Sequence, residues 1–246
     1  MITQSEVTRA TTRMANGKAV DIYRPAAKGG PDPLPAVLIW HGMGPDERET
    51  LRPVAEATAA GGTVVIAPDW RSDAPDRGRA HLLDSLEFVG KEAAAHGADA
   101  DRLVVAGWSA GAGAAVGLVT HPDLLDGPRP AAVVGIAGRY DVPARTTGTA
   151  PLDDIVAHAP EAAAVHLVHG TEDELDVTYS RVFAEALAAR AWPVRLVEPV
   201  SDHAGVLMSA YDAVVGRCVP SASERARLGG EATVHAILSA ALGLRT

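Results

Sequence analysis

The feature that most constrains the fold is the alternation of short, continuous apolar runs with longer segments of helical periodicity. Continuous apolar runs are typical of strands that are buried on both faces of a parallel sheet. They occupy residues 36–40, 63–67, 102–107, 131–136, 164–168 and 193–197. Helical patterns occupy residues 47–60, 79–95, 110–120, 177–191 and 230–242. This alternation predicts a doubly wound α/β sheet.

The first residues follow a different pattern, which predicts a β-hairpin. Residues 7–13 and 19–23 flank Asn16-Gly17, and Asn-Gly is a strong signal for a tight turn. These two strands and the six apolar runs together predict an eight-stranded, mostly parallel sheet with helices on both faces. A chain of 246 residues fits one α/β domain, and we expect residues 1–246 to form it.

Composition narrows the class of function. Hydrophobic residues make up 47% of the chain, which is typical of a globular protein. The net charge of −9 argues against binding to nucleic acid or to anionic lipid, because both require a basic surface. No apolar run is long enough to span a bilayer, and residues 1–6 show no secretory pattern. We therefore expect a cytoplasmic protein that binds neither nucleic acid nor membrane.

Cys218 is the single cysteine, so neither an internal disulfide nor a cysteine-rich metal site is expected. We interpret it as a small buried residue, since nothing in the sequence supports a reactive thiol. The segment 218–224 is either a plain loop or part of a dimer contact, and this leaves a homodimer open.

Ser109 stands in a motif that suits nucleophilic catalysis. Gly107-Trp108-Ser109-Ala110-Gly111 matches Gly-x-Ser-x-Gly and joins a predicted strand to a predicted helix. A sharp strand–helix turn presents such a serine, and tiny residues two positions before and after it allow the turn. By itself the motif equally fits an incidental serine in a glycine-rich turn.

A base and an acid follow Ser109 in the order that a serine nucleophile of this kind needs. Asp173 follows the seventh predicted strand and His203 follows the eighth, which gives the order Ser, Asp, His. The histidine takes the proton of the serine, and the carboxylate orients the histidine. Other carboxylates compete with Asp173: its loop neighbours Glu172, Glu174 and Asp176, and Asp141 after the sixth strand. Asp202 is interpreted as a solvated neighbour of His203.

On these residues, and on His41-Gly42 and Tyr140-Asp141, the chain from Asp21 to His203 resembles the α/β-hydrolase family. Its nearest branches are small serine esterases, dienelactone hydrolases and kynurenine formamidases. The resemblance implies the α/β-hydrolase fold with Ser109 as nucleophile, Asp173 as acid and His203 as base.

The oxyanion hole is expected at two backbone amides, those of Ala110 and Met43. Many esterase relatives have His-Gly-Gly-Gly where this chain has His41-Gly-Met-Gly44, and Met43 is expected to narrow the pocket. His41 is interpreted as a structural residue that ties this loop down. Gly42, Trp108 and Tyr140 are predicted to contact the substrate.

The substrate is expected to be small because the sequence leaves little room for a cap. Residues 139–161 predict a short lid with a helix at 151–156, and no extended cap is apparent. No cofactor or metal is expected. His166 and His169 have the spacing of a metal pair, but no third ligand accompanies them. Arg71 and Arg139 are weaker candidates for holding an anionic group.

Together these features predict a serine hydrolase that cleaves a small carboxylic ester through an acyl-enzyme intermediate. The same triad also serves acyltransferases, thioesterases and amidases or formamidases. A non-catalytic binding protein with this fold is the remaining alternative, because a fold alone does not decide a reaction.

Overall fold

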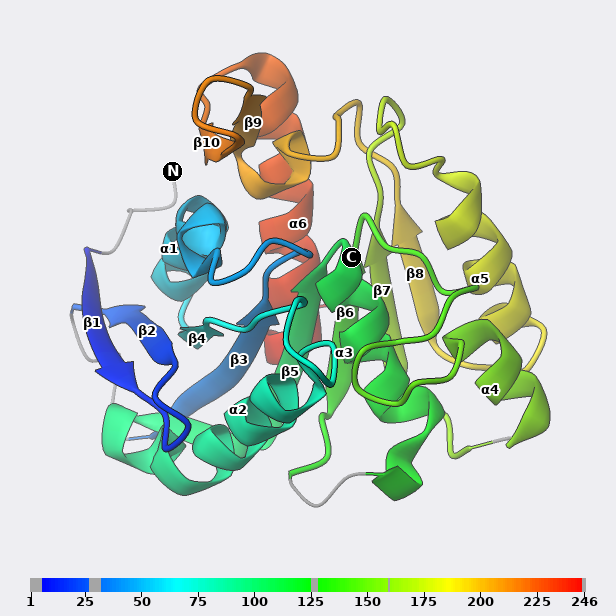
Figure 1. Cartoon of the computed structure of the whole chain (residues 1–246), viewed down its shortest axis with the longest axis horizontal. Coiled ribbons are helices and arrows are strands. Elements are labelled where there is room, and N and C mark those ends of the chain that lie inside the picture. Colours follow the sequence, from blue (N-terminus) through cyan, green and yellow to red (C-terminus); the bar gives the residue numbers. More distant parts are fainter. Residues whose placement is uncertain (1–5, 27–31, 125–127, 159, 245–246) are drawn as a thin grey trace.

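One twisted sheet of eight strands forms the centre of the molecule, in the order β1-β2-β4-β3-β5-β6-β7-β8 (Figure 1). The structure is a computed structural model and describes residues 6–26, 32–124, 128–158 and 160–244. The strands are β1 (Val7–Arg13), β2 (Ala19–Pro25), β3 (Leu34–Trp40), β4 (Val64–Pro68), β5 (Ala98–Trp108), β6 (Ala132–Ile136), β7 (Ala164–Val168) and β8 (Val194–Val197). Strands β3 to β8 pair in parallel, whereas β2 is antiparallel to both β1 and β4. The predicted sheet and N-terminal hairpin are thus confirmed.

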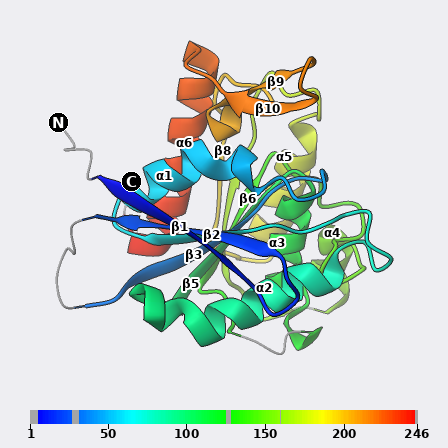
Figure 2. The same ribbon diagram turned by 60° about the vertical axis from the view of Figure 1, so that its left-hand side comes forward.

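Helices cover both faces of the sheet, as the apolar runs required. The α-helices are α1 (Arg52–Ala60), α2 (Arg79–Glu92), α3 (Ala110–Thr120), α4 (Pro151–Ala157), α5 (Thr178–Ala188) and α6 (Glu224–Leu242). Helices α1 and α6 lie on one face and α2 lies on the other (Figure 2). The core accordingly forms two clusters, one that includes Val54 and Ile237 and one that includes Leu86 and Phe183.

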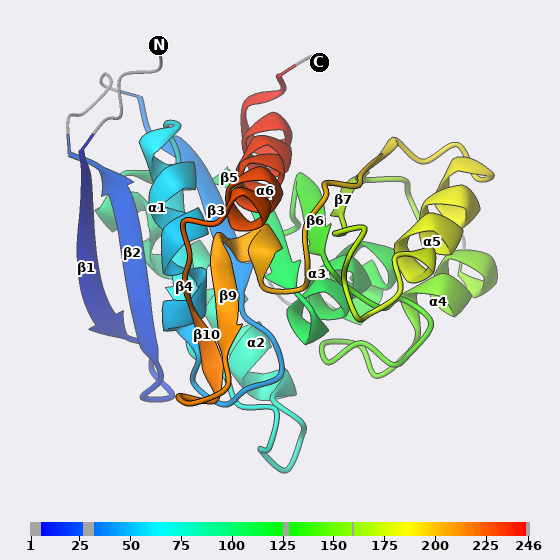
Figure 3. The ribbon, with the colours of Figure 1, turned by 90° about the horizontal axis from the view of Figure 1, so that it is seen from above.

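Two features of the C-terminal part differ from the prediction. Helix α6 begins at Glu224 rather than near residue 230, and the hydroxyl of Ser223 caps it by accepting from the amide of Ala226. Residues 209–220 form a small antiparallel hairpin, β9 (Ser209–Asp212) and β10 (Arg217–Pro220), where no element was predicted. This hairpin lies on the face of α1 and α6 (Figure 3). Cys218 is half-buried in it, and burial raises the pKa of the thiol to about 11.

A buried ionic network fixes the N-terminal hairpin to the rest of the sheet. The Asp21 side chain is fully buried and accepts from Arg9 at 2.6 Å, Thr11 at 2.6 Å and Arg48 at 3.0 Å. Arg48 also pairs with Asp69, which follows β4. Arg48 therefore joins β2 to the loops that follow β3 and β4, at the carboxyl edge of the parallel strands.

Helix α3 is made of alanine, glycine and other small or aliphatic residues, and every residue from Gly111 to Thr120 is buried. Small side chains allow the helix to lie close against β5 and β6.

The short helix predicted in the lid is confirmed as α4, although residue 159 of the predicted lid lies outside the described residues. Among the described residues, no helix combines the length and apolar character needed to cross a lipid bilayer.

Candidate active site

Ser109 sits at the junction of β5 and α3 in a backbone conformation that side chains rarely adopt. Its φ is 56° and its ψ is −117°, which makes it one of the few non-glycine residues with positive φ. Its amide donates to the carbonyl of Ile136 at 2.8 Å, and this bond anchors the turn to β6. Strained backbone of this kind concentrates at functional sites. The turn leaves the serine half-exposed at the amino end of α3, where the helix dipole favours negative charge.

Glycines make this turn possible because the backbone approaches other chain segments too closely for a Cβ atom. A Cβ on Gly107 would overlap the carbonyl group of Gly111, and one on Gly111 would lie 2.6 Å from the carbonyl oxygen of His41. A Cβ on Gly42 would lie 2.8 Å from the ring of Trp108 and 3.4 Å from the Cβ of Ser109. The loop after β3 therefore packs directly against the serine turn.

Asp173 and His203 come together from the loops that follow β7 and β8. Asp173 Oδ2 lies 2.8 Å from His203 Nδ1, and the carboxylate is fully buried while the imidazole is 32% exposed. Asp173 Oδ1 also accepts from the amide of Leu175 at 2.7 Å. The carboxylate thus holds His203 with a proton on Nδ1, which leaves Nε2 as the basic nitrogen.

The surroundings of Asp173 keep it ionised. Burial raises its pKa, but hydrogen bonding from His169 and His203 outweighs burial and lowers the pKa to about 2. His169 is fully buried, and its Nε2 lies 2.7 Å from the carbonyl oxygen of Leu175 and 3.4 Å from Asp173 Oδ2. Its Nδ1 lies 2.8 Å from the hydroxyl of Ser180, on α5. His169 therefore braces the acid loop, a role that the sequence did not indicate.

Trp108 connects the histidine to the serine turn. Its indole nitrogen donates to the carbonyl of His203 at 2.9 Å, and the two rings are tilted with centroids 4.9 Å apart. Because Trp108 directly precedes Ser109, this contact places His203 beside the turn that presents Ser109. No hydrogen bond joins Ser109 to His203 in the described part of the chain, and His203 Nε2 is likewise unbonded there. Such bonds often tighten only when substrate binds.

Four of the competing carboxylates have other partners. Asp141 pairs with Arg139 at 2.7 Å, and this pairing lowers the pKa of Asp141. Glu172 pairs with Arg225, and Asp176 accepts from the amide of Thr178, the first residue of α5. Asp202 accepts from the amide of Gly205 at 2.7 Å. Of the carboxylates weighed from the sequence, the structure brings Asp173 to His203.

A cavity of about 330 Å³ opens at Ser109, and both predicted oxyanion residues line it. They are Met43 and Ala110. Neither backbone amide donates a hydrogen bond to another described residue, so both are free to bind an oxyanion. The side chain of Met43 is 60% exposed at the mouth of the cavity. This arrangement suits the oxyanion-hole role, which stays a prediction.

His41 supports this loop from beneath. It is fully buried, and its Nε2 accepts from the amides of Glu47 at 3.3 Å and Trp70 at 3.2 Å. Its Nδ1 donates to the carbonyl of Gly42 at 3.0 Å. Burial lowers the pKa of His41 to about 3, so the ring stays neutral in this arrangement. The structural role expected for His41 agrees with these contacts.

The predicted substrate contacts need correction. The Tyr140 side chain is 1% exposed and stacks on Phe183, so it faces the core and not the cavity. Trp108 is 6% exposed and is occupied with His203, and Gly42 is buried beneath the Trp108 ring. None of the three lines the cavity. Each supports the site from within the protein.

Two arginines that the sequence reasoning missed do line the cavity. They are Arg77, whose φ is 59°, and Arg145, whose guanidinium lies 3.5 Å from the sulfur of Met43. No carboxylate among the described residues pairs with either of them. Burial, and then repulsion from Arg77, lowers the pKa of Arg145. The expected Arg71 is instead paired with Asp73 and Asp46. Arg139 does line the cavity, but Asp141 already neutralises it.

No sequence signal marks these two arginines, because both lie in loops without periodicity.

In the described part of the chain, no group of metal-ligating side chains lies around Ser109, Asp173 and His203. Among the residues that the structure describes, the one group of suitable side chains is His121, Asp154 and His158, at the far end of α3. His166 and His169, whose spacing resembled a metal pair, are not part of it.

Comparison with known proteins gives no match to a family model and none to a curated protein sequence. Solved structures do match. A putative dienelactone hydrolase from Klebsiella pneumoniae has a TM-score of 0.69 at 23% identity, over 94% of this chain and 98% of that one. Esterase 2 of Thermogutta terrifontis, phosphorylated by paraoxon, has a TM-score of 0.68 at 22% identity, over 97% and 95%. An S-formylglutathione hydrolase from Staphylococcus aureus has a TM-score of 0.63 at 16% identity, over 82% and 91%.

At these identities the likeness establishes the fold alone. The strand order, the turn at Ser109 and the positions of the acid and the histidine at the carboxyl edge of the sheet agree with it. The resemblance to kynurenine formamidases stays a prediction. The chain has the α/β-hydrolase fold, as the motifs in its sequence implied.

Proposed function

We propose that this protein is a serine hydrolase that cleaves small carboxylic esters through an acyl-enzyme intermediate. The observation that carries the proposal is the Asp173–His203 hydrogen bond, held by Trp108 beside a serine in a left-handed turn. An incidental serine would need neither a strained backbone nor an oriented histidine beside it.

The reaction follows from these positions. His203 Nε2 takes the proton of Ser109 as the serine oxygen attacks the ester carbonyl. The amides of Met43 and Ala110 bind the oxyanion that forms, and each such donor is worth on the order of 3 kcal/mol in the transition state. The imidazolium, stabilised by ionised Asp173, gives its proton to the leaving alcohol. Water then attacks the acyl-enzyme with His203 again as base.

The cavity favours a small substrate that carries a negative charge. About 330 Å³ accommodates a short acyl or alcohol group, and Arg77 and Arg145 supply positive charge without a carboxylate partner among the described residues. Arginine is well suited to hold a carboxylate through two parallel hydrogen bonds. We therefore expect esters that bear a carboxylate near the scissile bond to bind better than neutral ones of the same size.

The solved relatives support the proposal at the level of chemistry. One is described as a dienelactone hydrolase, and another is an esterase that paraoxon phosphorylates. Their identity to this chain is too low to transfer a substrate.

Covalent labelling tests the proposal before any substrate is known. The protein is treated with paraoxon, and the modified peptide is mapped by mass spectrometry. We expect one adduct, on Ser109, and none in Ser109→Ala. His203→Gln should slow labelling by about 1,000-fold or more, because the hydroxyl then lacks its base.

The same experiment separates the alternatives. An acyltransferase would be favoured if paraoxon labels Ser109, no ester is hydrolysed, and the acyl group of an ester is transferred to added alcohols, amines or thiols. Failure of paraoxon to label the folded protein would overturn the proposal. A binding protein that keeps the fold would then be the better account, in line with the missing Ser109–His203 bond.

A further inference from the structure

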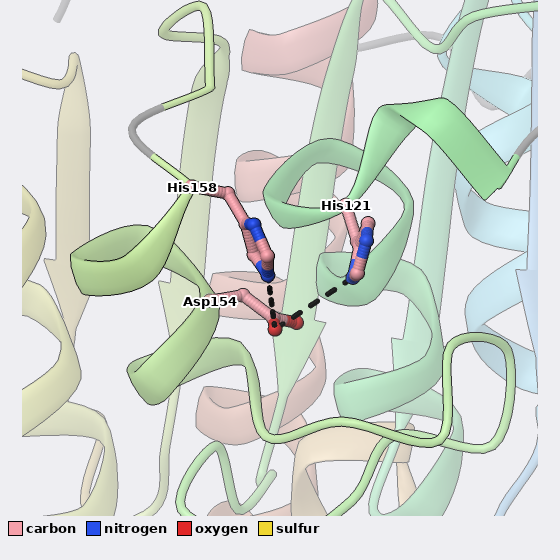
Figure 4. A group of neighbouring side chains, drawn as sticks. All are labelled: His121, Asp154 and His158. Carbon is pink, nitrogen blue, oxygen red and sulfur yellow. Dashed lines mark ion pairs between the residues drawn. The ribbon is translucent and has the colours of Figure 1, made fainter.

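Two histidines and a carboxylate converge on one point at the end of α3 that is remote from Ser109. His121 follows α3, Asp154 belongs to α4, and His158 directly follows α4. Asp154 Oδ1 lies 3.7 Å from His121 Nδ1 and 3.8 Å from His158 Nε2, and the ligand atoms lie within 4.8 Å of one another. Figure 4 shows the two rings next to each other, each with one edge directed at the carboxylate.

The carboxylate is buried and held in one orientation. The Asp154 side chain is 3% exposed, against 20% for His121 and 49% for His158. The hydroxyl of Thr149 donates to Asp154 Oδ2 at 2.7 Å, which leaves Oδ1 facing the two imidazoles. A hydrogen bond to the outer oxygen of a carboxylate is the usual support of a metal ligand. No arginine or lysine among the described residues pairs with Asp154.

We propose that His121, Asp154 and His158 bind one divalent transition-metal ion, with zinc as the best match to the donors. Two imidazole nitrogens and one carboxylate oxygen are typical zinc ligands, whereas magnesium and calcium prefer oxygen alone. The exposed edge of His158 leaves room for water as a fourth ligand. The negative end of the α3 dipole also favours a cation at this position.

The distances are compatible with such a site after a small contraction. Tetrahedral ligands at about 2.0–2.1 Å from zinc lie about 3.3 Å apart. The two nitrogen–oxygen separations of 3.7 and 3.8 Å exceed this by a few tenths of an ångström. The ion would sit at the edges of the two packed rings, where His121 Nδ1 and His158 Nε2 both face Asp154 Oδ1. Rotation of the exposed His158 side chain is enough to admit it.

Metal binding would hold the segment 139–158 in place against α3. The segment 139–158 contributes Arg139, Val142 and Arg145 to the cavity at Ser109 and ends at His158. A metal ion held by His121 and α4 would fasten this segment to α3. The site is independent of the proposed function, because none of its ligands belongs to the triad or the oxyanion loop.

The test measures metal binding directly. The full chain is treated with EDTA, exchanged into buffer and titrated with ZnCl₂, and bound zinc is counted by elemental analysis after gel filtration. We expect one zinc ion per chain and a rise of several degrees in Tm at saturating zinc. Magnesium at the same concentration should leave Tm unchanged. Co²⁺ should give the intense visible absorption of a tetrahedral nitrogen–oxygen site.

Variants locate the ion. His158→Gln and His121→Gln should each abolish stoichiometric binding, and both change partly exposed side chains, so the fold is retained. Thr149→Val should weaken zinc binding about 10-fold to 100-fold, because it frees the outer carboxylate oxygen. The matched control is His96→Gln, a change at a half-buried histidine in the short 3-10 helix that follows α2. This variant should bind zinc as the unaltered protein does.

Two outcomes would overturn the site. One is the absence of zinc binding at micromolar concentration. The other is binding that survives both His121→Gln and His158→Gln, which would place the ion elsewhere, for example at His203. Failure of paraoxon labelling would bear on Ser109 alone.

Discussion

At the scale of single residues, the acid of the site is defined by its neighbours rather than by its position in the chain. Asp173 is surrounded by two histidines and the amide of Leu175, whereas Asp141 is exposed and neutralised by Arg139. A buried carboxylate without such donors would take up a proton. Stability, and the function proposed above, therefore depend on the ionised form of Asp173.

The lowered pKa of Asp173 predicts a pH-dependent contribution to stability. Its pKa is about 2 in the folded protein, against an ordinary value of 3.8. The contribution is complete above pH 4 and is lost as the pH falls from about 4 to about 2. Asp173→Asn should therefore lower the free energy of unfolding by about 2 kcal/mol at pH 7. This difference should shrink below pH 4, as urea denaturation at several pH values would measure.

Asp141→Asn is the matched control for this prediction. Its carboxylate is exposed, so the free energy of unfolding should change by less than about 1 kcal/mol. It should also leave ester turnover nearly intact, while Asp173→Asn lowers kcat by orders of magnitude. The reverse ranking in kcat would move the acid to the loop after β6.

Gly42 gives a second prediction at this scale. A Cβ at this position would lie 2.8 Å from the Trp108 ring, which holds His203. Gly42→Ala should thus displace the ring and the oxyanion loop and lower kcat about 100-fold, because catalysis is sensitive to shifts of about 1 Å. The measurement is kcat with a p-nitrophenyl ester, beside circular dichroism to confirm the fold.

Gly90→Ala serves as the control for Gly42→Ala. Gly90 lies within α2, where a Cβ would have only an ordinary contact with Pro128 at 3.4 Å. This change should leave kcat unaltered and stabilise the protein by about 0.5–1 kcal/mol. Equal losses of kcat in both variants would refute the role given to Gly42.

At the scale of elements, the segment between β6 and α4 sets the size and charge of the cavity. It is short, it provides Arg145, and it carries no further helix before α4. The catalytic loops are fixed by the sheet. Substrate preference is therefore expected to follow this segment more than any strand.

Arg145→Gln tests the charge of the cavity. The variant should raise KM about 10-fold for the p-nitrophenyl monoester of succinate, because it removes a guanidinium that lies beside the cavity. KM for the neutral p-nitrophenyl butyrate should change little. A similar rise for both esters would show that Arg145 shapes the cavity and does not bind an anion.

Acyl length tests the size of the cavity. Acetyl to butyryl esters should be cleaved with higher kcat/KM than dodecanoyl esters, because a cavity of about 330 Å³ has no room for a long chain. Preference for the dodecanoyl ester would mean that the segment 139–158 moves aside.

The elements show which parts of a fold a sequence can predict. The strands were predictable because a continuous apolar run fits a strand that is buried on both faces of a parallel sheet. Helix α3 was predictable because its small residues suit a helix that packs closely against such a sheet. The start of α6 was missed because Gly229 and Gly230 resemble a helix boundary. The β9–β10 hairpin was missed because its strands are short and mostly exposed.

Some residues of the candidate site could likewise be predicted from the sequence, and others could not. Ser109, Asp173 and His203 follow strand ends in a fixed order, so the topology brings their loops to one edge. Tyr140 was misplaced because an aromatic side chain near the cavity mouth can turn inward to meet Phe183. Arg77 and Arg145 depend on loop conformation, which has no periodic signal in the sequence.

At the scale of the whole molecule, the N-terminal hairpin is fastened by charge as well as by the sheet. Asp21 is fully buried between Arg9 and Arg48, and Arg48 reaches on to Asp69. Asp21→Ala should lower the free energy of unfolding by about 3 kcal/mol, because it removes the buried carboxylate that Arg9 and Arg48 share and leaves each of these partly buried guanidinium groups with one carboxylate fewer. Urea denaturation would measure this loss.

Arg13→Ala offers a control in the same hairpin. Arg13 is exposed and donates to the carbonyl of Gly17, so its removal should cost less than about 1 kcal/mol. If Asp21→Ala were as mild as Arg13→Ala, the sheet hydrogen bonds alone would suffice to hold the hairpin.

The burial of α3 limits how such a protein can diversify. From Gly111 to Thr120 every side chain faces the interior, so the helix behind Ser109 has no surface position at which a larger or charged residue could be accepted. A saturation library over the chain should show near-complete intolerance along α3 and wider tolerance at the exposed positions 141 and 143 of the loop that follows β6. New specificities in this lineage would then arise by exchange of that loop, while the helix that follows Ser109 stays unchanged.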